Sequence, residues 1–265
     1  MSAKASLRLA ESAEMTEREV RVELAACYRV FDLLGWVELI FNHITAKVPG
    51  PDDHFLINPF GLHYSEVTAS NLVKIDLDGN IVGDSEWPVN LAGFVIHSAI
   101  HRARPDVRCI MHTHTTTGMA VACLEAGLTQ TNFYSAMLEG CVAYHDFEGT
   151  TTRADECDRL VDSLGDKDLL ILRNHGLLTC GSTVAEAFAH LYRLQRACDV
   201  QIATAAAAPV TGAGIIAVDE AAARYSTESR GLVTMGAADD EAQLSATTFD
   251  AMKRLVDRKD PSYRD

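Results

Sequence analysis

The chain has 265 residues, of which 48% are hydrophobic and 23% charged, so it can bury the core of one large domain or two small ones. Its formal net charge of −14 reflects 37 acidic against 23 basic side chains, and this charge disfavours nucleic acid as a partner. Residues 1–14 lack the apolar core of a signal peptide, and the most apolar block, residues 30–41, is too short to span a membrane. We therefore expect a cytoplasmic protein that makes no membrane contacts.

The beginning of the chain combines one helix with short strands. Thr16 and Glu19 form a capping-box pattern, and apolar residues at helical spacing follow, which predicts an amphipathic helix. The stretch 54–59, HFLINP, is predicted as a strand. Asp78-Gly79 lies between two alternating apolar runs, as the turn of a hairpin would.

Helices and strands alternate in the middle of the chain. Asn90 can cap a helix that Pro105 ends, and the segment 107–114, VRCIMHTH, is predicted as a buried strand. Further helices are predicted over 116–124 and 153–164, and strands over 141–144 and 168–181, the last with a turn at Asn174-His175-Gly176.

The last third of the chain is predicted to be mainly helical. Thr183 and Glu186 cap a long amphipathic helix, and a final helix is predicted over 240–257. The stretch 205–217, AAAAPVTGAGIIA, has neither clean periodicity nor charge and is interpreted as a linker or packed arm. We expect one α/β domain over residues 16–200 and a helical extension over 201–265.

Two histidines two residues apart, His112 and His114, end the predicted buried strand. Residues i and i+2 of a strand point to the same side, so both imidazoles can face one point, and imidazole is the commonest neutral metal ligand. The spacing alone is weak, because a chain with 10 histidines can contain such a pair by chance. His175, at a strand-to-turn corner, is a candidate third ligand. From the residues alone, a metal site and ordinary polar side chains both remain open.

Two segments resemble the histidine motifs of the class II aldolase/adducin N-terminal domain superfamily. They are RPDVRCIMHTH at 104–114 and LLILRNHGLL at 169–178, and the similarity covers about residues 16–200. The resemblance implies an α/β fold, a three-layer α/β/α sandwich around a central mixed, largely antiparallel sheet. We expect the C-terminal helical extension, residues 201–265, to pack on this sandwich in the same or a neighbouring subunit.

The resemblance also implies a cofactor and an assembly. His112, His114 and His175 would hold one divalent metal ion per subunit, zinc ahead of manganese, iron or cobalt. Members of the superfamily complete each pocket with residues of a neighbouring subunit, so a homotetramer is expected.

Four further residues match or flank parts of the superfamily's pocket. His43, in FNHITAKVPG, matches a segment that lines the substrate pocket, although a structural histidine at a strand start is the alternative. Asn42 resembles the aldolases' phosphate-binding asparagine. His97 and His101 are four residues apart on a predicted helix, and we expect His97 to be a polar neighbour of the site and His101 to face solvent.

The sequence departs from the sugar-phosphate aldolases at two places. Their Ser-Ser-Glu, which ends in the acid/base, is replaced by Leu91, Ala92 and Gly93 in an alignment without gaps. Phe60 stands where a phosphate-binding threonine would be, with Gly61 retained, so an apolar ring replaces a hydroxyl. A phosphorylated sugar is therefore not expected as substrate. The expected substrate-binding residues are Asn42, Phe60, Gly61 and Gly93.

These departures favour decarboxylation over retro-aldol cleavage, because loss of carbon dioxide creates the carbanion without a base for a substrate hydroxyl. The expected function is a divalent-metal-dependent lyase that cleaves a C–C bond of a small non-phosphorylated carbonyl or carboxylate substrate. His43, Tyr134 and Glu139 are the candidate acid/base residues, and Phe60, Trp87 or Phe133 could form an apolar wall. The alternative is a non-catalytic, adducin-like binding or assembly module, because adducins share the loss of the glutamate.

Glu86, in DSEWPVNLAG, imitates the aldolase Ser-Glu-Trp. It precedes His112 by 26 residues, more than the aldolase spacing, and Pro88 and Asn90 behind it read as the approach to a helix. We expect Glu86 to lie outside the site.

Overall fold

The computed structural model describes residues 15–50, 53–150, 153–232 and 240–265. The segment 1–14, predicted above not to be a signal peptide, lies outside the described residues. Across the described part of the chain, no helix combines the length and the apolar character that crossing a membrane requires.

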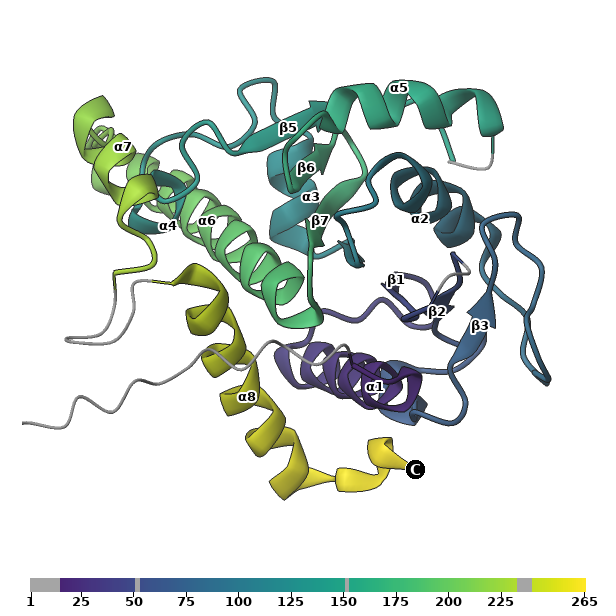
Figure 1. Ribbon diagram of the computed structural model, residues 1–265. Coiled ribbons are helices and arrows are strands. Elements are labelled where there is room, and N and C mark those ends of the chain that lie inside the picture. The colour runs from purple at the N-terminus through teal and green to yellow at the C-terminus, as the bar shows by residue number, and fades with distance from the viewer. Residues whose placement is uncertain (1–14, 51–52, 151–152, 233–239) are drawn as a thin grey trace, which may run out of the picture.

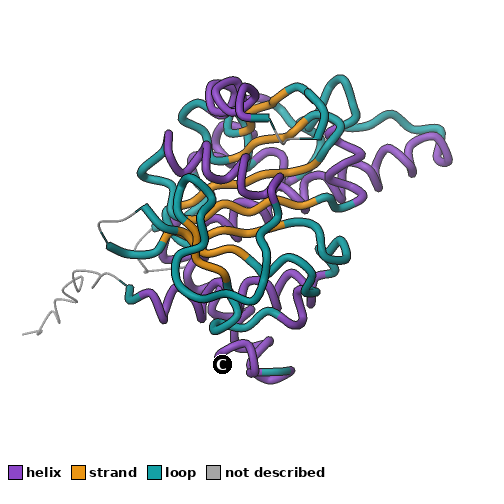
Figure 2. Tube along the Cα trace, turned by 90° about the vertical axis from the view of Figure 1, so that its right-hand side faces the viewer, coloured by secondary structure: helices purple, strands orange, loops and turns teal. Residues whose placement is uncertain are grey.

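A seven-stranded sheet forms the centre of the fold, in the order β3-β2-β1-β4-β7-β6-β5. Only the β5–β6 pair is parallel, and the other neighbouring pairs are antiparallel. Figure 2 shows these strands side by side between helices. The predicted mixed, largely antiparallel sheet is confirmed. The strands are β1 (His43–Lys47), β2 (Phe55–Ile57), β3 (Val73–Ile75), β4 (Cys109–Thr113), β5 (Val142–His145), β6 (Leu169–Leu172) and β7 (Gly176–Gly181).

Alternation along the central strands gives the sheet two apolar faces. Met111 and Leu177 join the core beneath α1, α3, α6 and α8, whereas Ile110 and Leu178 pack against α2 and α5. Helices therefore cover both faces, which confirms the three-layer arrangement (Figure 1). The helices are α1 (Glu17–Leu34), α2 (Leu91–Ala103), α3 (Thr116–Ala122), α4 (Phe133–Ala136), α5 (Ala154–Leu164), α6 (Val184–Thr211), α7 (Glu220–Glu228) and α8 (Glu241–Lys259), with 3₁₀ turns η1 (Tyr64–Glu66) and η2 (Pro261–Arg264).

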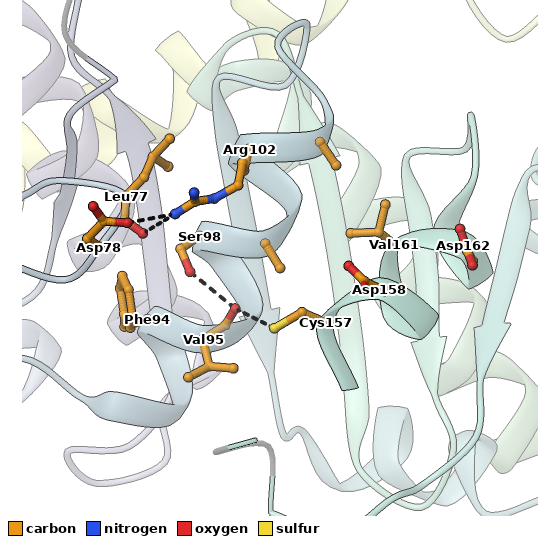
Figure 3. A pocket seen from close by; sticks show the side chains of 12 residues that line it. Leu77, Asp78, Phe94, Val95, Ser98, Arg102, Cys157, Asp158, Val161 and Asp162 are labelled. Atoms are coloured by element: carbon orange, nitrogen blue, oxygen red, sulfur yellow. Dashed lines mark hydrogen bonds and ion pairs between the residues drawn. The ribbon is translucent and has the colours of Figure 1, made fainter. Parts of the chain in front are cut away.

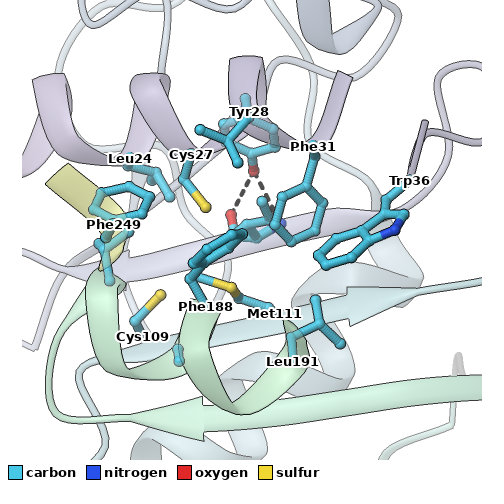
Figure 4. Packing of buried hydrophobic residues seen from close by; sticks show 14 of the residues in the cluster. Leu24, Cys27, Tyr28, Phe31, Trp36, Cys109, Met111, Phe188, Leu191 and Phe249 are labelled. Carbon is cyan, nitrogen blue, oxygen red and sulfur yellow. Dashed lines mark hydrogen bonds between the residues drawn. The ribbon is translucent and has the colours of Figure 1, made fainter. Parts of the chain in front are cut away.

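The larger core joins α1, α6 and α8 to the sheet (Figure 4). Phe188 of α6 packs against Phe249 of α8 with ring centroids 5.5 Å apart, so the C-terminal helix covers its own chain. On the other side of this core, the hydroxyl of Tyr28 accepts a hydrogen bond of 2.9 Å from the amide of Ile44. This bond fixes the start of β1, immediately after His43.

The predicted helix starts are confirmed. Thr16 and Glu19 form the capping box of α1, Asn90 caps α2, and Thr183 caps α6. The predicted hairpin at Asp78-Gly79 is reduced to a single bridge between Ile75 and Ile81.

The stretch 205–217, interpreted above as a linker or packed arm, is helical up to Thr211 and has no regular structure over 212–217. Helix α6 continues without a break through residue 200 to Thr211 and includes Pro209 near its end. Alanine has the highest helix propensity, so four consecutive alanines at 205–208 extend the helix even though they show no amphipathic pattern. The expected boundary at residue 200 thus falls inside one helix.

Candidate metal centre

Three histidines converge where β4 ends and β7 begins. His112 is the fourth residue of β4, His114 follows that strand, and His175 immediately precedes β7, which is the antiparallel neighbour of β4. One ring nitrogen from each can be chosen so that all three lie within 4.8 Å of one another. The sheet register therefore brings His175 next to His114 and His112, which precede it by 61 and 63 positions in the sequence.

The turn before β7 has the backbone geometry that this convergence needs. Asn174 adopts a left-handed conformation with φ of 55°, which presents the next residue, His175. A methyl group at Gly176 would lie 2.3 Å from the carbonyl oxygen of Thr113, so only glycine allows this close approach of the two strands.

Hydrogen bonds set the tautomers of two of these imidazoles. Nδ1 of His112 lies 2.9 Å from the carbonyl oxygen of Leu177, and Nδ1 of His114 contacts the carboxylate of Glu38. A carbonyl or carboxylate oxygen only accepts, so both Nδ1 atoms carry protons and both Nε2 atoms are left to act as ligands.

The two Nε2 atoms face each other at 2.7 Å. Two nitrogen lone pairs this close repel each other unless the two imidazoles share a proton or bind one cation. Burial, with neighbouring imidazoles, holds the pKa of His112 well below its usual range and lowers that of His175 to about 4, which keeps both neutral near pH 7. Three imidazoles, two of which have the tautomer fixed by a hydrogen bond at Nδ1, fit a divalent cation with open coordination positions.

Glu38 was not identified from the sequence as part of the site. It follows α1 in a loop in which Leu39 and Asn42 both adopt positive φ, 51° and 38°. The available signal was that Glu38 is one of two carboxylates, with Asp32, inside the apolar block 30–41, and that it precedes His43 by five residues.

A cavity of about 600 Å³ opens next to the three histidines and is also lined by Asn42, His43 and Phe60. Phe41 and Phe147, which sequence reasoning missed, add apolar walls, and the rings of Phe41 and Phe60 are 6.4 Å apart. The cavity is thus mainly apolar apart from the imidazoles, Glu38 and a few amides.

The expected substrate-binding residues occupy different positions. Phe60 lines the cavity, and Gly61 follows it with a φ of 111° but is not part of the lining. Asn42 lines the cavity, and its buried Oδ1 has no hydrogen-bond partner among the described residues. A buried amide oxygen without a partner is costly unless a ligand supplies a donor.

Gly93 acts through His43 and does not itself line the cavity. A methyl group at position 93 would lie 2.5 Å from Cδ2 of the His43 ring. The imidazole therefore fills the space into which a side chain at position 93 would project. Burial, followed by the nearby His114 and His175, lowers the pKa of His43 to about 3, so this ring is neutral near pH 7.

The other two acid/base candidates do not line the cavity formed by one chain. Tyr134, in α4, lies beneath the guanidinium of Arg196, 5.6 Å from its ring centre, and Glu139 lies in the turn that follows α4. Trp87 packs with the β2–β3 core and Phe133 is exposed, so neither forms the apolar wall. Glu86 is exposed and borders a separate surface hollow with Ile81 and Ser85, away from the cavity.

The expectation that His101 faces solvent is wrong. His101 is 1% exposed, and its Nε2 lies 2.9 Å from the hydroxyl oxygen of Thr45, which also contacts Nδ1 of His97 at 2.8 Å. Residues four apart share one face of a helix, so the packing of α2 against β1 buries both histidines together.

A larger groove of about 920 Å³ lies between α2 and α5 (Figure 3). Among the described residues that line it, the exposed side chains of Arg102 and Asp78 form an ion pair, and the sulfur of Cys157 contacts the carbonyl of Val95. Such a lining offers no grouped ligands or paired nucleophile and base, so the histidine cavity remains the candidate site.

Residues 22–202 match the model of the Class II Aldolase and Adducin N-terminal domain. An aldolase II superfamily protein from Pseudomonas syringae has a similar structure, with a TM-score of 0.85, 43% identity and coverage of 96% of this chain and 98% of that one. L-fuculose 1-phosphate aldolase from Glaciozyma antarctica PI12 has a TM-score of 0.78 and 31% identity, covering 94% and 93%. Alpha-adducin of Rattus norvegicus is 43% identical over 91% of this chain, which spans 33% of that protein. The chain belongs to the class II aldolase and adducin N-terminal domain family.

Proposed function

We propose that this protein is a divalent-metal-dependent lyase that cleaves a C–C bond of a small, non-phosphorylated carbonyl or carboxylate substrate. The observation that carries the proposal is the facing pair of Nε2 atoms of His112 and His114, with His175 as the third ligand. Zinc is the metal we propose first, with manganese, iron or cobalt as alternatives. When bound, such a cation stabilises the negative charge that develops on a substrate oxygen as the C–C bond breaks.

The protein residues then have separate roles. Glu38 and the carbonyl of Leu177 hold the two imidazoles with Nε2 toward the cavity. We propose that His43 takes part in proton transfer, since its ring lines the cavity and occupies the space next to Gly93. Asn42 binds the substrate through its free amide oxygen, and Phe60 supplies an apolar wall.

The lining of the cavity supports a substrate without a phosphate group. The described residues that line it include no lysine and no arginine, and Glu38 contributes a negative charge. Phosphate is usually bound by basic side chains, often together with a helix N-terminus. The N-terminus of α2 borders the cavity, but no basic side chain accompanies it among the described lining residues, so a carboxylate or carbonyl bound by the metal is the better fit. The proposed substrate, which carries no phosphate, therefore differs from the phosphorylated sugar in the name of the L-fuculose 1-phosphate aldolase reported above.

The first test is metal content. Wild-type protein should retain close to one divalent metal ion per chain, measured by atomic emission after dialysis, and His175→Ala should lose most of it. His190→Gln is the matched control, because His190 is also buried and its Nδ1 contacts a carbonyl oxygen, that of Cys180, but it does not line the cavity. Unchanged metal in His175→Ala would contradict the proposal. The loaded protein is then screened for turnover of hydroxy acids and aromatic carboxylates.

We also propose that the active form is a homotetramer. Leu39, Phe41, Leu91 and Phe147 are large apolar residues near the cavity that remain between 46% and 72% exposed in one chain. Clustered exposed apolar side chains are typical of an interface. Tyr134 and Glu139 could then act on the cavity of a neighbouring subunit. A monomer in sedimentation at micromolar concentration would contradict this assembly and remove both residues from consideration.

An adducin-like, non-catalytic role is the second candidate. It is favoured by the 43% identity to alpha-adducin and by Gly93 in place of the aldolase glutamate. A protein that binds no metal and turns over none of the screened compounds would support it over the lyase.

A further inference from the structure

A continuous line of buried polar side chains runs inward from the cavity, between α2 and β1. Nδ1 of His43 lies 3.0 Å from Nε2 of His97, and Nδ1 of His97 lies 2.8 Å from the hydroxyl oxygen of Thr45. That oxygen lies 2.9 Å from Nε2 of His101, whose Nδ1 lies 3.4 Å from the carbonyl oxygen of Val107. The four side chains are at most 4% exposed.

Local structure explains the line. His43 and Thr45 are two residues apart on β1 and share one face of the sheet, while His97 and His101 are four apart on α2 and share one face of the helix. The metal ligands use none of these contacts, so the function proposed above leaves the line unexplained.

The far end of the line sets the direction of every hydrogen bond. The carbonyl of Val107 can only accept, so Nδ1 of His101 donates and Nε2 of His101 must accept. Burial, followed by the charge of Lys47, lowers the pKa of His101 to about 3, so this ring has a single N–H. The one hydroxyl proton of Thr45 is therefore donated to His101.

The same logic continues toward the cavity. Because the Thr45 proton is used, its oxygen accepts from Nδ1–H of His97, and Nε2 of that neutral ring is left as an acceptor. His43 then donates from Nδ1, and its Nε2, which has no hydrogen-bond partner among the described residues, carries a lone pair. The reverse order would place two lone pairs against each other at Val107.

We propose that His101, Thr45 and His97 are positioning residues that hold His43 in one tautomer, with an unprotonated Nε2 presented to the cavity as a hydrogen-bond acceptor. Given the function proposed above, this deepens it by restricting the substrate. The group that lies against His43 must be a donor, such as a hydroxyl or an N–H next to the metal-bound oxygen. An ether or a second carboxylate at that position would meet a lone pair.

The tautomer is measured directly by long-range ¹H–¹⁵N correlation NMR of the imidazoles in the full-length protein, with His43→Gln to assign the signals. We expect His43 to show a protonated Nδ1 and an unprotonated Nε2. The opposite pattern, or an average of both tautomers, would overturn the proposal. This result needs neither turnover nor an identified substrate.

Thr45 provides the matched variants. Thr45→Ser keeps the hydroxyl and should leave the His43 pattern unchanged, whereas Thr45→Val removes the hydroxyl and should convert His43 to a mixture of tautomers. His190→Gln, a buried histidine outside the line, should have no effect. A single unchanged tautomer in folded Thr45→Val would show that the line positions nothing. If Thr45→Val does not fold, the spectra of wild type and Thr45→Ser still show whether His43 is held in the proposed tautomer.

The substrate restriction is tested with glycolate and methoxyacetate on zinc-loaded protein by calorimetry, since these probes differ by having a hydroxyl or an ether. Wild type should bind glycolate about tenfold more tightly than methoxyacetate, a ratio that corresponds to the free energy of about one neutral hydrogen bond. Thr45→Val should reduce this ratio of affinities at least threefold. If wild type and Thr45→Val show the same ratio of affinities for glycolate and methoxyacetate, the proposed restriction of the substrate is wrong. Failure of the metal site would instead appear as no binding of either probe, with the NMR result unaffected.

Discussion

Gly93 leaves the space that the His43 ring occupies, because a methyl group at position 93 would lie 2.5 Å from Cδ2 of that ring. The two residues come from different layers, His43 from the sheet and Gly93 from the first turn of α2. The residue that the resemblance aligns with the aldolase glutamate therefore packs directly against the proposed acid/base, and we expect the two positions to be coupled.

The coupling predicts a change of sign in a double-mutant cycle. Gly93→Ala should lower the free energy of unfolding by about 1–3 kcal/mol in wild type, because the added methyl overpacks against the ring. In a His43→Ala background the same substitution should raise it by up to about 1 kcal/mol, since alanine favours the helix more than glycine does. Urea unfolding of the four proteins gives the comparison, and equal effects in both backgrounds would show that the ring and residue 93 are independent.

Glu38 should matter for metal affinity although it is not a ligand. Glu38→Ala removes the acceptor of the His114 Nδ1 proton and should weaken zinc binding by about 10- to 100-fold, as is usual for the loss of such a partner. Glu38→Gln keeps an acceptor oxygen and should weaken it less. Competition with a chromophoric chelator measures both, and equal affinity of Glu38→Ala and wild type would place Glu38 outside the metal centre.

Burial of His101 predicts a pH dependence of stability in the metal-free protein. Its pKa is about 3 in the fold, lowered by burial and Lys47, and about 6.5 in the unfolded chain, so between these values the unfolded chain binds more protons. The contribution of His101 is fully present above pH 6.5 and is lost progressively as pH falls toward 3. The largest slope for this one group is about 1.4 kcal/mol per pH unit.

The slope is measured by urea unfolding at pH 7, 6 and 5 in wild type and His101→Gln. The variant should show a smaller decrease in unfolding free energy between pH 6 and 5, because glutamine does not titrate. Identical slopes in the two proteins would mean that His101 does not remain neutral in the fold.

Glu86 should be dispensable for catalysis, because it is exposed and borders a different hollow from the metal site. On whichever substrate the screen identifies, Glu86→Gln should lower kcat less than about tenfold, whereas His43→Ala should lower it by about 10²–10⁴ as for a positioned acid or base. If Glu86→Gln keeps its metal but loses as much activity as His43→Ala, a retro-aldol mechanism with Glu86 as the acid/base becomes the better proposal.

Sequence patterns alone determined the elements and the ligands that depend on local spacing. The cap patterns at Thr16 and Thr183 located two helices, and the apolar run in 107–114 predicted β4, with His112 and His114 two residues apart on one side. These features follow from periods of 3.6 and 2 residues, which a short window of sequence already contains.

The tertiary structure alone decided what surrounds those ligands. Glu38 reaches His114 across 76 residues, and Thr45 meets His101 across 56, only because β1 pairs with β4 and α2 packs over β1. His101 therefore became a buried neutral ring and Gly93 the space for His43. Hydrogen-bond direction and steric room depend on atoms placed by strand pairing and helix packing, and no local period in the sequence encodes these long-range contacts.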